Sequence, residues 1–511
     1  MHYTTHRFLP FFIGILYLLL AISSVQFDDI TYDEQDHLNY GIRLLKGKSS
    51  RQQPGADFNT TMPVSILNAL PRAAEQLVHP TLEKKDGGES DAKQGRYITI
   101  LATLLLLAYL YFFGKAIAGH VAGCWAMLLA ALDPNILAHS RLVTTDLYGT
   151  LAWIATLFHL HQWLHKKENN HFYYWCIALA ISQCCKINNI LLYPICLLSI
   201  LGYQFYNGFR LSGKKVWLPL LSFVLIQLFI INIAFLFYHT GMPLDAYAFK
   251  SNFFRELQHQ WISVIPIPLP QSFIDTFDLT LYERESFTGT AQNYLIGEWR
   301  YQKGFWNYYF FCWMVKTPLL TGLLVFTSAI TSLVNKQFRR QSIYFLIIPS
   351  AIVLLLLSSS SVQSGYRYLL PVLAASLVSA GVFIQKTMSR LPKHTGILIS
   401  IGLGTAVLLS FPNYISYTSE WQWPKKNAYR YLSDSNLNWG QRQKKIQQIL
   451  QQNPDYHFEP LTPVTGQIVV DINKVTGIID TEKFAWLRNN YSPIAVIEGC
   501  YLLYEVKELP R

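Results

Sequence analysis

Long apolar segments recur along the chain and alternate with polar ones. Most are close to the ~20 residues that a helix needs to cross the hydrocarbon core of a bilayer. This pattern predicts a polytopic α-helical membrane protein with about eleven transmembrane helices. We expect the spans at residues 8–26, 97–118, 121–139, 144–164, 172–185, 188–206, 216–238, 306–333, 343–360, 367–385 and 395–414.

Two of these segments allow alternatives. The apolar run at 8–26 follows Arg7 and is also compatible with a signal peptide, although no clear small-residue cleavage site comes after it. The run at 172–185 is short for a span, and Lys186 separates it from the next run. The number of spans between residues 172 and 206 therefore stays open.

Positive charge is concentrated in every second loop between the predicted spans. Short loops that carry an excess of Lys and Arg stay on the cytoplasmic side of a membrane. This places the N-terminus in the cytoplasm, and it places segments 27–96 and 239–305 and the tail from residue 415 on the outer side. The charged loops hold Arg7; Lys115; Lys166 and Lys167; Arg210, Lys214 and Lys215; Lys336, Arg339 and Arg340; and Lys386, Arg390 and Lys393.

Composition agrees with a membrane protein and argues against other classes. Only 14% of the residues are charged, against roughly 25% in soluble domains. The net charge of +11 is not accompanied by a basic stripe or a nucleic-acid motif. Six of the seven cysteines lie in apolar segments, which argues against a disulfide framework or a cysteine-based zinc site.

The first outer segment contains a helical pattern. Within 33–47, Leu38, Gly41, Ile42 and Leu45 recur at the spacing of one apolar helix face. This pattern predicts an amphipathic helix that lies on the membrane surface.

The tail has the size of a small α/β domain. Segments 466–471 and 495–497 are typical of strands, and 442–452 is typical of a helix. We therefore expect a transmembrane domain over 1–414, which includes both outer loops, and an extracytoplasmic C-terminal domain over 415–511.

Acidic residues stand at the outer ends of two predicted spans. Asp33 and Glu34 follow the first span, and Asp146 lies at the start of the fourth. Structural roles are available for all three, because Thr31-x-x-Glu34 has the form of a capping box and acids are favoured in a first helical turn. Ionisable residues at membrane level are, however, functional candidates by default. Two acids on one face are able to share a divalent metal or to divide base and positioning roles.

Cationic residues near the same face offer contacts for a phosphate group. Arg367 lies at the outer end of the tenth span and is either a snorkelling side chain or a phosphate clamp. His79 and Lys84 belong either to a turn followed by solvated lysines or to a phosphate contact. Lys316 lies about ten residues inside the eighth span, which Glu298 precedes. An unpaired charge is expensive there, so we expect Lys316 to have a partner.

A set of short motifs resembles the membrane glycosyltransferases of the C-type (GT-C) fold. The similarity is closest to the protein O-mannosyltransferase and aminoarabinose-transferase group, in particular to its bacterial phospholipid-carrier-dependent members of family 39 type. Each motif is short, but their order and membrane placement together are specific. The motifs are Tyr32-Asp33-Glu34 with His37; Gly95-Arg96; Asp133-Pro134-Asn135; His139-Ser140; Thr144-Thr145-Asp146; Gly297-Glu298; Gly304; Tyr308-Tyr309; Lys316-Thr317-Pro318; Tyr366-Arg367-Tyr368-Leu369-Leu370-Pro371; and Asp434-Ser435-Asn436-Leu437-Asn438-Trp439-Gly440-Gln441.

The resemblance implies a sugar transfer at the outer membrane face. In this family an acceptor hydroxyl attacks the anomeric carbon of a sugar on a polyprenyl phosphate, and the lipid phosphate leaves. Carried over to this chain, Asp33 would be the general base or acceptor-positioning carboxylate, Glu34 would support it, and Asp146 would be the second acid. The donor phosphate would meet Arg367, Lys316, His79 and Lys84, and further site candidates are His37, Arg96 and Glu298.

The sequence departs from the family pattern at two points. Relatives often carry two prolines where this chain has His79-Pro80-Thr81, and Asp where it has Asn438. The first departure weakens the case for His79, and the second leaves Asn438 without a role. Some relatives bind a divalent metal near the acids, which leaves a metal held by Asp33 and Asp146 open. No nucleotide-phosphate loop is visible, in agreement with a lipid-linked donor.

A glycosyltransferase is the leading hypothesis, and two alternatives remain. A transporter or flippase of a lipid-linked sugar would favour mid-membrane ionisable residues and a repeat between halves, but the acids lie at one face and no repeat is visible. A non-catalytic donor-binding subunit fits less well with the retained acids. The residues do not fix the sugar, which is mannose or another hexose or pentose, or the acceptor, which is a protein, lipid or glycan hydroxyl. Protein O-glycosylation and a bacterial inner membrane are the favoured context.

Overall fold

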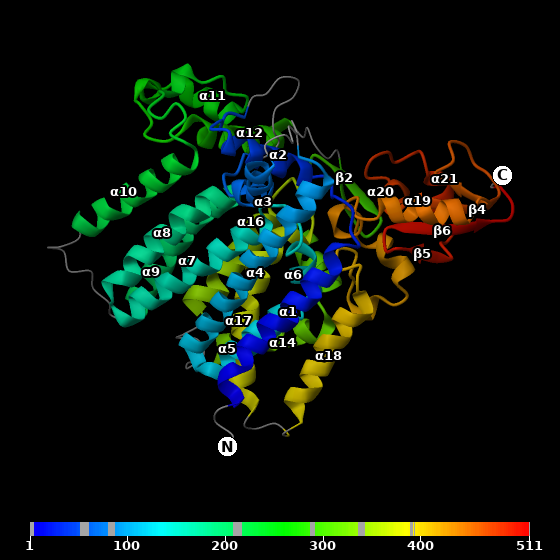
Figure 1. The fold of residues 1–511 in the computed structure, drawn as a ribbon, viewed down its shortest axis with the longest axis horizontal. Coiled ribbons are helices and arrows are strands. Elements are labelled where there is room, and N and C mark those ends of the chain that lie inside the picture. Colours follow the sequence, from blue (N-terminus) through cyan, green and yellow to red (C-terminus); the bar gives the residue numbers. More distant parts are fainter. Residues whose placement is uncertain are drawn as a thin grey trace.

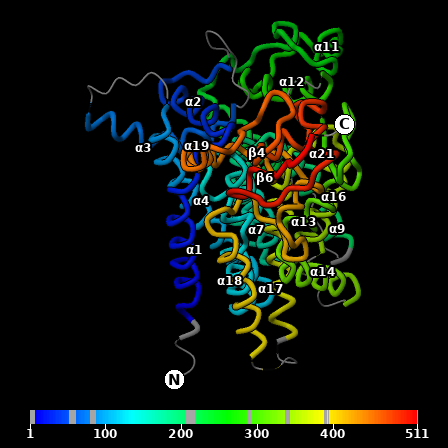
Figure 2. Tube along the Cα trace, turned by 90° about the vertical axis from the view of Figure 1, so that its right-hand side faces the viewer, coloured from blue at the N-terminus to red at the C-terminus, as the bar shows by residue number. Residues whose placement is uncertain are grey.

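The computed structural model describes residues 5–51, 61–79, 87–207, 217–286, 292–335, 343–388, 392 and 394–509. Most of these residues are helical, and the longer helices form one bundle (Figure 1). The polar segments lie over one end of this bundle, while α1 begins at the opposite end (Figure 2).

Helices occupy each of the eleven predicted spans in the described part of the chain. Four are long and apolar enough to cross a membrane, and shorter apolar helices accompany them. The predicted polytopic helical architecture is therefore confirmed. The bundle helices are α1 (Leu9–Val25), α4 (Glu89–Ala118), α5 (His120–Ala131), α6 (Pro134–His139), α7 (Asp146–Lys166), α8 (Asn169–Cys185), α9 (Leu192–Asn207), α10 (Trp217–Ala234), α13 (Tyr308–Lys316), α14 (Leu319–Val334), α16 (Ile348–Ser358), α17 (Leu370–Met388) and α18 (Thr395–Ser410).

Several spans are interrupted by non-helical backbone. Lys186 has an extended backbone (φ −154°, ψ 133°) and separates α8 from the short helix η2 (Ile187–Leu191). Pro318 separates α13 from α14, because proline lacks the N–H that would continue the hydrogen-bond ladder. Irregular backbone at membrane depth is tolerated where protein or a cavity surrounds it. The interruption at Lys186 explains why the number of spans near it was hard to predict.

The predicted helix in the first outer segment forms as α2 (Glu34–Leu45). Its apolar face does not lie on the membrane surface as expected, because Leu38 and Ile42 are buried in a small core shared with α3 (Ser65–Val78) and α4. Gly41 permits this packing, since a Cβ atom there would come within 2.2 Å of the Ser65 carbonyl oxygen. Apolar side chains are exposed on α3 instead.

The second outer segment covers one end of the bundle with short elements (Figure 1). Its helix α12 has a buried face that includes Phe273, Thr276 and Leu279, and it shares a small apolar core with α7 and α8. The elements are η4 (Leu244–Ala246), α11 (Asn252–Gln258), η5 (Trp261–Val264), α12 (Gln271–Ser286) and the antiparallel hairpin of β1 (Gln292–Leu295) and β2 (Glu298–Tyr301).

The tail folds around a four-stranded sheet of order β3-β4-β6-β5, in which only the β3–β4 pair is parallel. The predicted strands and helix of the tail all form. Buried arginines join this region to the bundle, since Asp28 pairs with Arg442 at 3.1 Å and with Arg141 at 2.7 Å. The elements are η8 (Glu420–Gln422), η9 (Lys425–Arg430), η10 (Asp434–Asn436), α19 (Gln443–Gln452), β3 (Tyr456–Phe458), β4 (Gly466–Asp471), α20 (Ile472–Thr476), α21 (Ala485–Asn490), β5 (Ala495–Ile497) and β6 (Tyr501–Val506).

Candidate active site

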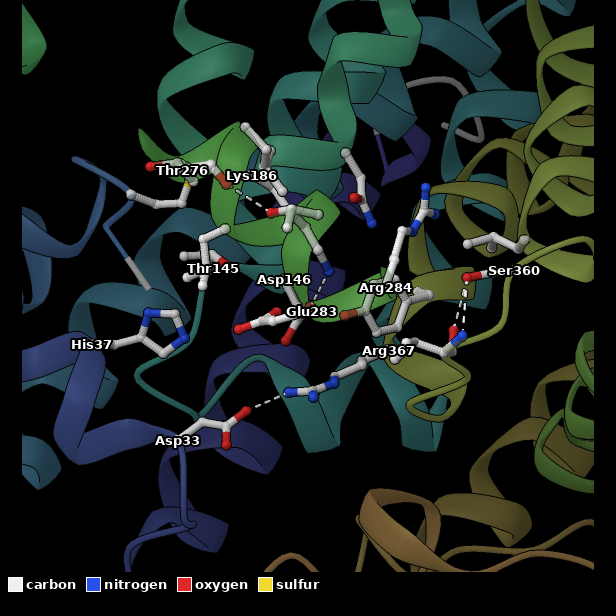
Figure 3. Close-up of a pocket in the computed structure, with 18 of the residues that line it drawn as sticks. Asp33, His37, Thr145, Asp146, Lys186, Thr276, Glu283, Arg284, Ser360 and Arg367 are labelled. Atoms are coloured by element: carbon white, nitrogen blue, oxygen red, sulfur yellow. Dashed lines mark hydrogen bonds and ion pairs between the residues drawn. The ribbon is translucent and has the colours of Figure 1, made fainter. Parts of the chain in front are cut away.

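A polar cavity of about 300 Å³ lies at the end of the bundle opposite the start of α1. It is enclosed by the start of α2, the start of α7, the α8–η2 interruption, α12 and the short helix η7 (Tyr366–Leu369), as Figure 3 shows. Elements that are far apart in the sequence thus meet around one hollow. Its charged and histidine side chains are Asp33, Asp36, His37, Asp146, Lys186, Glu283, Arg284 and Arg367.

Asp33 faces the cavity and is paired with Arg367. The Oδ2 atom of Asp33 accepts a hydrogen bond from Nη1 of Arg367 at 2.6 Å (Figure 3). Asp33 stands at the N-cap position of α2, but its side chain makes no capping hydrogen bond. Because 38% of the side chain remains exposed, its carboxylate is accessible to a molecule in the cavity.

Glu34 points away from the cavity and into the protein. Its Oε1 and Oε2 atoms accept hydrogen bonds from Nε and Nη2 of Arg96 at 2.9 and 2.7 Å. They also accept the backbone N–H groups of Val143 and Thr31. Burial alone would raise the pKa of the Glu34 carboxyl, but Arg96 and the two backbone donors bring it below its ordinary value. The Glu34 carboxylate is therefore a buried anion, and its hydrogen bonds hold α2 against α4 and against the segment before α7.

Asp146 is a second carboxylate that lines the cavity. It is the first residue of α7, where the helix dipole favours a negative charge. Lys186, in the α8–η2 interruption, forms an ion pair with its Oδ1 atom and lies 4.4 Å from the centroid of the Tyr368 ring (Figure 3). Sequence reasoning noted Lys186 only as an interruption. The signal that could have identified it is the cost of an unpaired charge at membrane level.

His37 lies on the wall of the cavity, to one side of Asp33 and Asp146 (Figure 3). Burial lowers the pKa of its imidazole, although Asp33 and Asp146 oppose the shift. Within the described ranges its Nδ1 atom has no hydrogen-bond partner. His37 is thus a largely buried imidazole on the cavity wall near Asp33.

Residues 434–441 in the tail contact Arg367 and the backbone on either side of it. The guanidinium group of Arg367 lies 4.5 Å from the centroid of the Trp439 ring. Asn436 accepts the backbone N–H of Tyr366 at 3.0 Å, and Ser435 donates to the carbonyl oxygen of Ser364 at 3.2 Å. The segment 434–441 therefore fixes the position of η7 and of the arginine that it carries.

We expect replacement of Trp439 by Leu to lower turnover about 2- to 30-fold, because a cation–π contact contributes about 0.5–2 kcal/mol. Trp439→Phe should restore most of the rate, since it keeps an aromatic face under Arg367. The same change at the exposed Trp423 is the control. Initial rates and unfolding midpoints would be compared, and equal rates for the Leu and Phe variants would remove the stacking argument.

The remaining predicted residues lie outside the cavity. Lys316 is buried and has the expected partners, because its Nζ atom donates to the carbonyl oxygens of Ile415 and Asn436 at 2.7 Å. Glu298 is exposed on β2, and His79 is exposed at the end of α3. Lys84 falls outside the described residues. The structure thus brings Asp33, Asp146, Arg367 and His37 together and leaves these others apart.

The two acids proposed for a metal do not present a suitable ligand set. Each is already paired with a side-chain cation, Asp33 with Arg367 and Asp146 with Lys186. A divalent ion such as Mg²⁺ or Ca²⁺ requires several oxygen ligands and would be repelled by these neighbouring cations. Across the described ranges no three His, Cys, Asp or Glu side chains are grouped to hold a metal. The residues present therefore do not fit a divalent ion.

A second, mostly apolar hollow of about 280 Å³ adjoins the polar cavity. The two share Lys186, Arg284 and Tyr368, which stand where they meet. Aromatic and aliphatic side chains from α11, α12, α16 and η2 form the apolar walls. They include Phe253, Phe254, Phe277, Leu281, Leu191, Val353 and Leu356.

Sequence comparison links part of the bundle to a known family. The family model described as dolichyl-phosphate-mannose-protein mannosyltransferase matches residues 88–235. This region includes Arg96, Asp146 and Lys186. No curated protein matches the chain.

Structural comparison identifies the fold. The crystal structure of ArnT from Cupriavidus metallidurans bound to undecaprenyl phosphate aligns with 79% of this chain and 64% of that chain, with a TM-score of 0.50 and 13% identity. The apo oligosaccharyltransferase of Archaeoglobus fulgidus aligns with 80% of this chain and 54% of that chain, with a TM-score of 0.46 and 11% identity. This chain therefore spans less than two thirds of these proteins.

The chain is an integral membrane protein with the GT-C fold of membrane glycosyltransferases. The resemblance to the mannosyltransferase and aminoarabinose-transferase group, which the short motifs predicted, is confirmed.

Proposed function

We propose that this protein is a glycosyltransferase that moves a sugar from a polyprenyl phosphate to an acceptor hydroxyl at the outer membrane face. The observation that carries the proposal is the meeting of two hollows, one polar with four carboxylates and one apolar, with two cations at their junction. Such a shape matches a donor that joins a sugar, a phosphate and a hydrocarbon chain. The matching family description and the GT-C fold support the same class.

The donor is proposed to lie across the junction. Its isoprenoid chain would occupy the apolar hollow, where contact with Phe253, Phe277 and Leu356 removes apolar surface from water. Its phosphate would lie beside Lys186 and Arg284, and its sugar would enter the polar cavity toward Asp33 and Asp146. Guanidinium and ammonium groups form strong charge-assisted hydrogen bonds with phosphate oxygens.

The transfer itself is a substitution at the anomeric carbon. The acceptor oxygen forms a bond to this carbon, the bond from the carbon to the phosphate oxygen breaks, and its electron pair stays on the leaving lipid phosphate. Asp33 takes the proton of the acceptor hydroxyl, while Arg367 holds the carboxylate in place. Lys186, Arg284 and the guanidinium of Arg367 stabilise the charge that develops on the phosphate.

The orientation of the protein follows from the same proposal. The site and the C-terminal sheet lie toward one end of the bundle, and α1 begins at the other (Figure 2). The positive loops predicted from the sequence favour a cytoplasmic N-terminus. We propose a bacterial inner membrane, with the site, residues 415–511 as a C-terminal domain and the acceptor on the outer side. Mannose and a protein hydroxyl are the first substrates to test.

The proposal is tested with purified protein in nanodiscs. Radiolabelled polyprenyl-phosphate mannose and other lipid-linked sugars would be supplied with a membrane extract of the source organism. Transfer of label to any acceptor supports the proposal, and the labelled fraction identifies the acceptor class. Binding of every donor without transfer would favour a flippase or a donor-binding subunit.

Arg284 provides a separate test of the phosphate position. Arg284→Gln should raise the KM for the donor about 10- to 100-fold, because a hydrogen bond to a charged group contributes about 1.5–3 kcal/mol. The control is Lys303→Gln, which removes an exposed cation in the loop after β2. Initial rates at varied donor concentration would be measured, and an unchanged KM would place the phosphate elsewhere.

A further inference from the structure

Asp33 and Asp146, the two carboxylates proposed for the reacting centre, are paired with cations supplied by the chain. Asp33 pairs with Arg367, and Asp146 pairs with Lys186. In many enzymes that act on phosphate esters, a divalent metal bound by carboxylates supplies positive charge to the leaving oxygen. Here that position near Asp146 is taken by an ammonium group.

Neighbouring residues fix the position of Lys186. Gly149 leaves the space for it, since a Cβ atom at residue 149 would lie 2.9 Å from the Cβ atom of Lys186. Asn189 secures the interruption that carries Lys186, because its Nδ2 atom donates to the carbonyl oxygens of Gly149 and Ser182 at 3.1 and 3.2 Å. The side chain of Asn189 is buried. Lys186 is therefore held at a fixed place on the cavity wall.

Lys186 also lies where the phosphate would be. It lines both the polar and the apolar hollow and lies against the ring of Tyr368, which lines both as well. Its side chain is 15% exposed, so the ammonium group is largely shielded from water yet faces the cavity. Attraction between an ammonium group and a phosphate is stronger in such a site than in bulk water.

We infer that Lys186 serves as a built-in replacement for a divalent metal, so that sugar transfer by this protein proceeds without one. The inference rests on the proposed function and assigns a cation to its leaving group. As the bond from the anomeric carbon to the phosphate oxygen breaks, the electron pair stays on the phosphate, where Lys186 stabilises it. Asp146 holds the ammonium group in place and balances its charge before the donor binds.

Chelation and substitution at Lys186 test the inference together. Wild-type turnover should stay within about 2-fold after removal of divalent ions with EDTA, whereas Lys186→Met should lose about 10²- to 10³-fold, the effect of removing one preorganised charge donor. Added Mg²⁺ or Mn²⁺ should not restore the rate of Lys186→Met, because Asp146 alone does not supply the several oxygen ligands that a divalent ion needs. Lys166→Met is the control for losing a lysine, because Lys166 is exposed at the end of α7, the helix that begins at Asp146.

Two outcomes would overturn the inference. One is a wild-type rate that EDTA abolishes and Mg²⁺ or Mn²⁺ restores, and the other is a Lys186→Met protein with the wild-type rate without metal. Should Lys186→Met fail to fold, Lys186→Arg keeps the charge and should remain active in EDTA. An Arg variant that depends on added metal would contradict the assignment.

A binding measurement separates this inference from the proposed function. Titration of Mn²⁺ into the purified protein, followed by electron paramagnetic resonance, should show no tight site in the wild type or in Lys186→Met. A tight wild-type site that Asp146→Asn removes would overturn the inference without any reference to turnover. Absence of transfer from all lipid-linked sugars would instead count against the proposed function.

Discussion

Replacement of Asp33 by Asn is expected to lower sugar transfer by about 10²- to 10⁴-fold, the range associated with the loss of a general base. The Asn side chain has the size of Asp and is able to accept the hydrogen bond from Arg367, so the cavity should keep its shape. An amide does not take a proton from the acceptor hydroxyl. The loss should therefore appear in kcat, while the KM for the donor stays close to the wild-type value.

The neighbouring Asp29→Asn variant is a close control for this experiment. Asp29 lies four residues before Asp33, but its carboxylate accepts the backbone N–H of Lys444 in the tail instead of facing the cavity. It should therefore keep the wild-type kcat. Near-normal turnover of Asp33→Asn would leave Asp33 only the role of positioning Arg367, since its side chain makes no capping hydrogen bond to α2.

The helical bundle was predictable because membrane insertion imposes a strong pattern on the sequence. A span needs about 20 apolar residues, and this requirement alone located every segment that carries a bundle helix. A run of β-branched apolar residues likewise located the strand at Gly466–Asp471, which is buried on both faces over residues 468–471. These predictions depend only on local composition and period.

The contacts of α2 were less predictable, because periodicity does not reveal which surface covers an apolar face. Leu38 and Ile42 have the spacing of a membrane-surface helix, yet they pack on protein because α3 folds over them. Gly41 was visible in the sequence, but the close approach of Ser65 that it permits depends on tertiary structure.

The site was predictable as a set of residue types and not as a set of partners. Asp33 and Asp146 were identified from their place at the outer ends of spans, and the structure places both on one cavity. Their cations come from positions 334 and 40 residues away in the sequence. Single-sequence patterns do not encode such pairings, which explains why Lys186 was missed and why Lys316 was first assigned to the phosphate.

Adjacent acids also proved to have different surroundings. Asp33 and Glu34 were treated as one motif, but consecutive residues at a helix start point in different directions. Asp33 faces the cavity, whereas Glu34 is fully enclosed with Arg96. The resemblance to a family motif therefore located both residues, but it did not show that Asp33 lies on the cavity while Glu34 is buried in a structural ion pair.

Replacement of Arg96 by Met should destabilise the protein by about 3–5 kcal/mol, the cost of leaving a buried charge without its partner. Neither side chain of the Arg96–Glu34 pair is exposed. Arg96 also donates to the backbone carbonyl oxygens of Asp28 and Asp29 at 2.9 and 2.7 Å. Its loss would therefore release the start of α2 and the chain after α1. A lowered unfolding midpoint, measured by tryptophan fluorescence in detergent, is the expected result.

A second ion pair on the same helix supplies the control. Lys93 and Glu89 lie one and two turns before Arg96 on α4 and form a pair at 3.0 Å whose side chains are about one-third exposed. Exposed pairs of this spacing contribute only about 0.3–0.5 kcal/mol. Lys93→Met should consequently leave the unfolding midpoint almost unchanged, although it removes a cation from the same segment.

The double variant Arg96→Met with Glu34→Gln separates a structural role of Glu34 from a catalytic one. A neutral Gln has one acceptor oxygen and is able to accept only one of the N–H groups of Thr31 and Val143, but it removes the buried charge, so the unfolding midpoint should recover part of its loss. Turnover should recover with the midpoint if Glu34 only holds α2 in place. If stability recovers while kcat stays low in the double variant, Glu34 supports the base electrostatically, as the family resemblance implied.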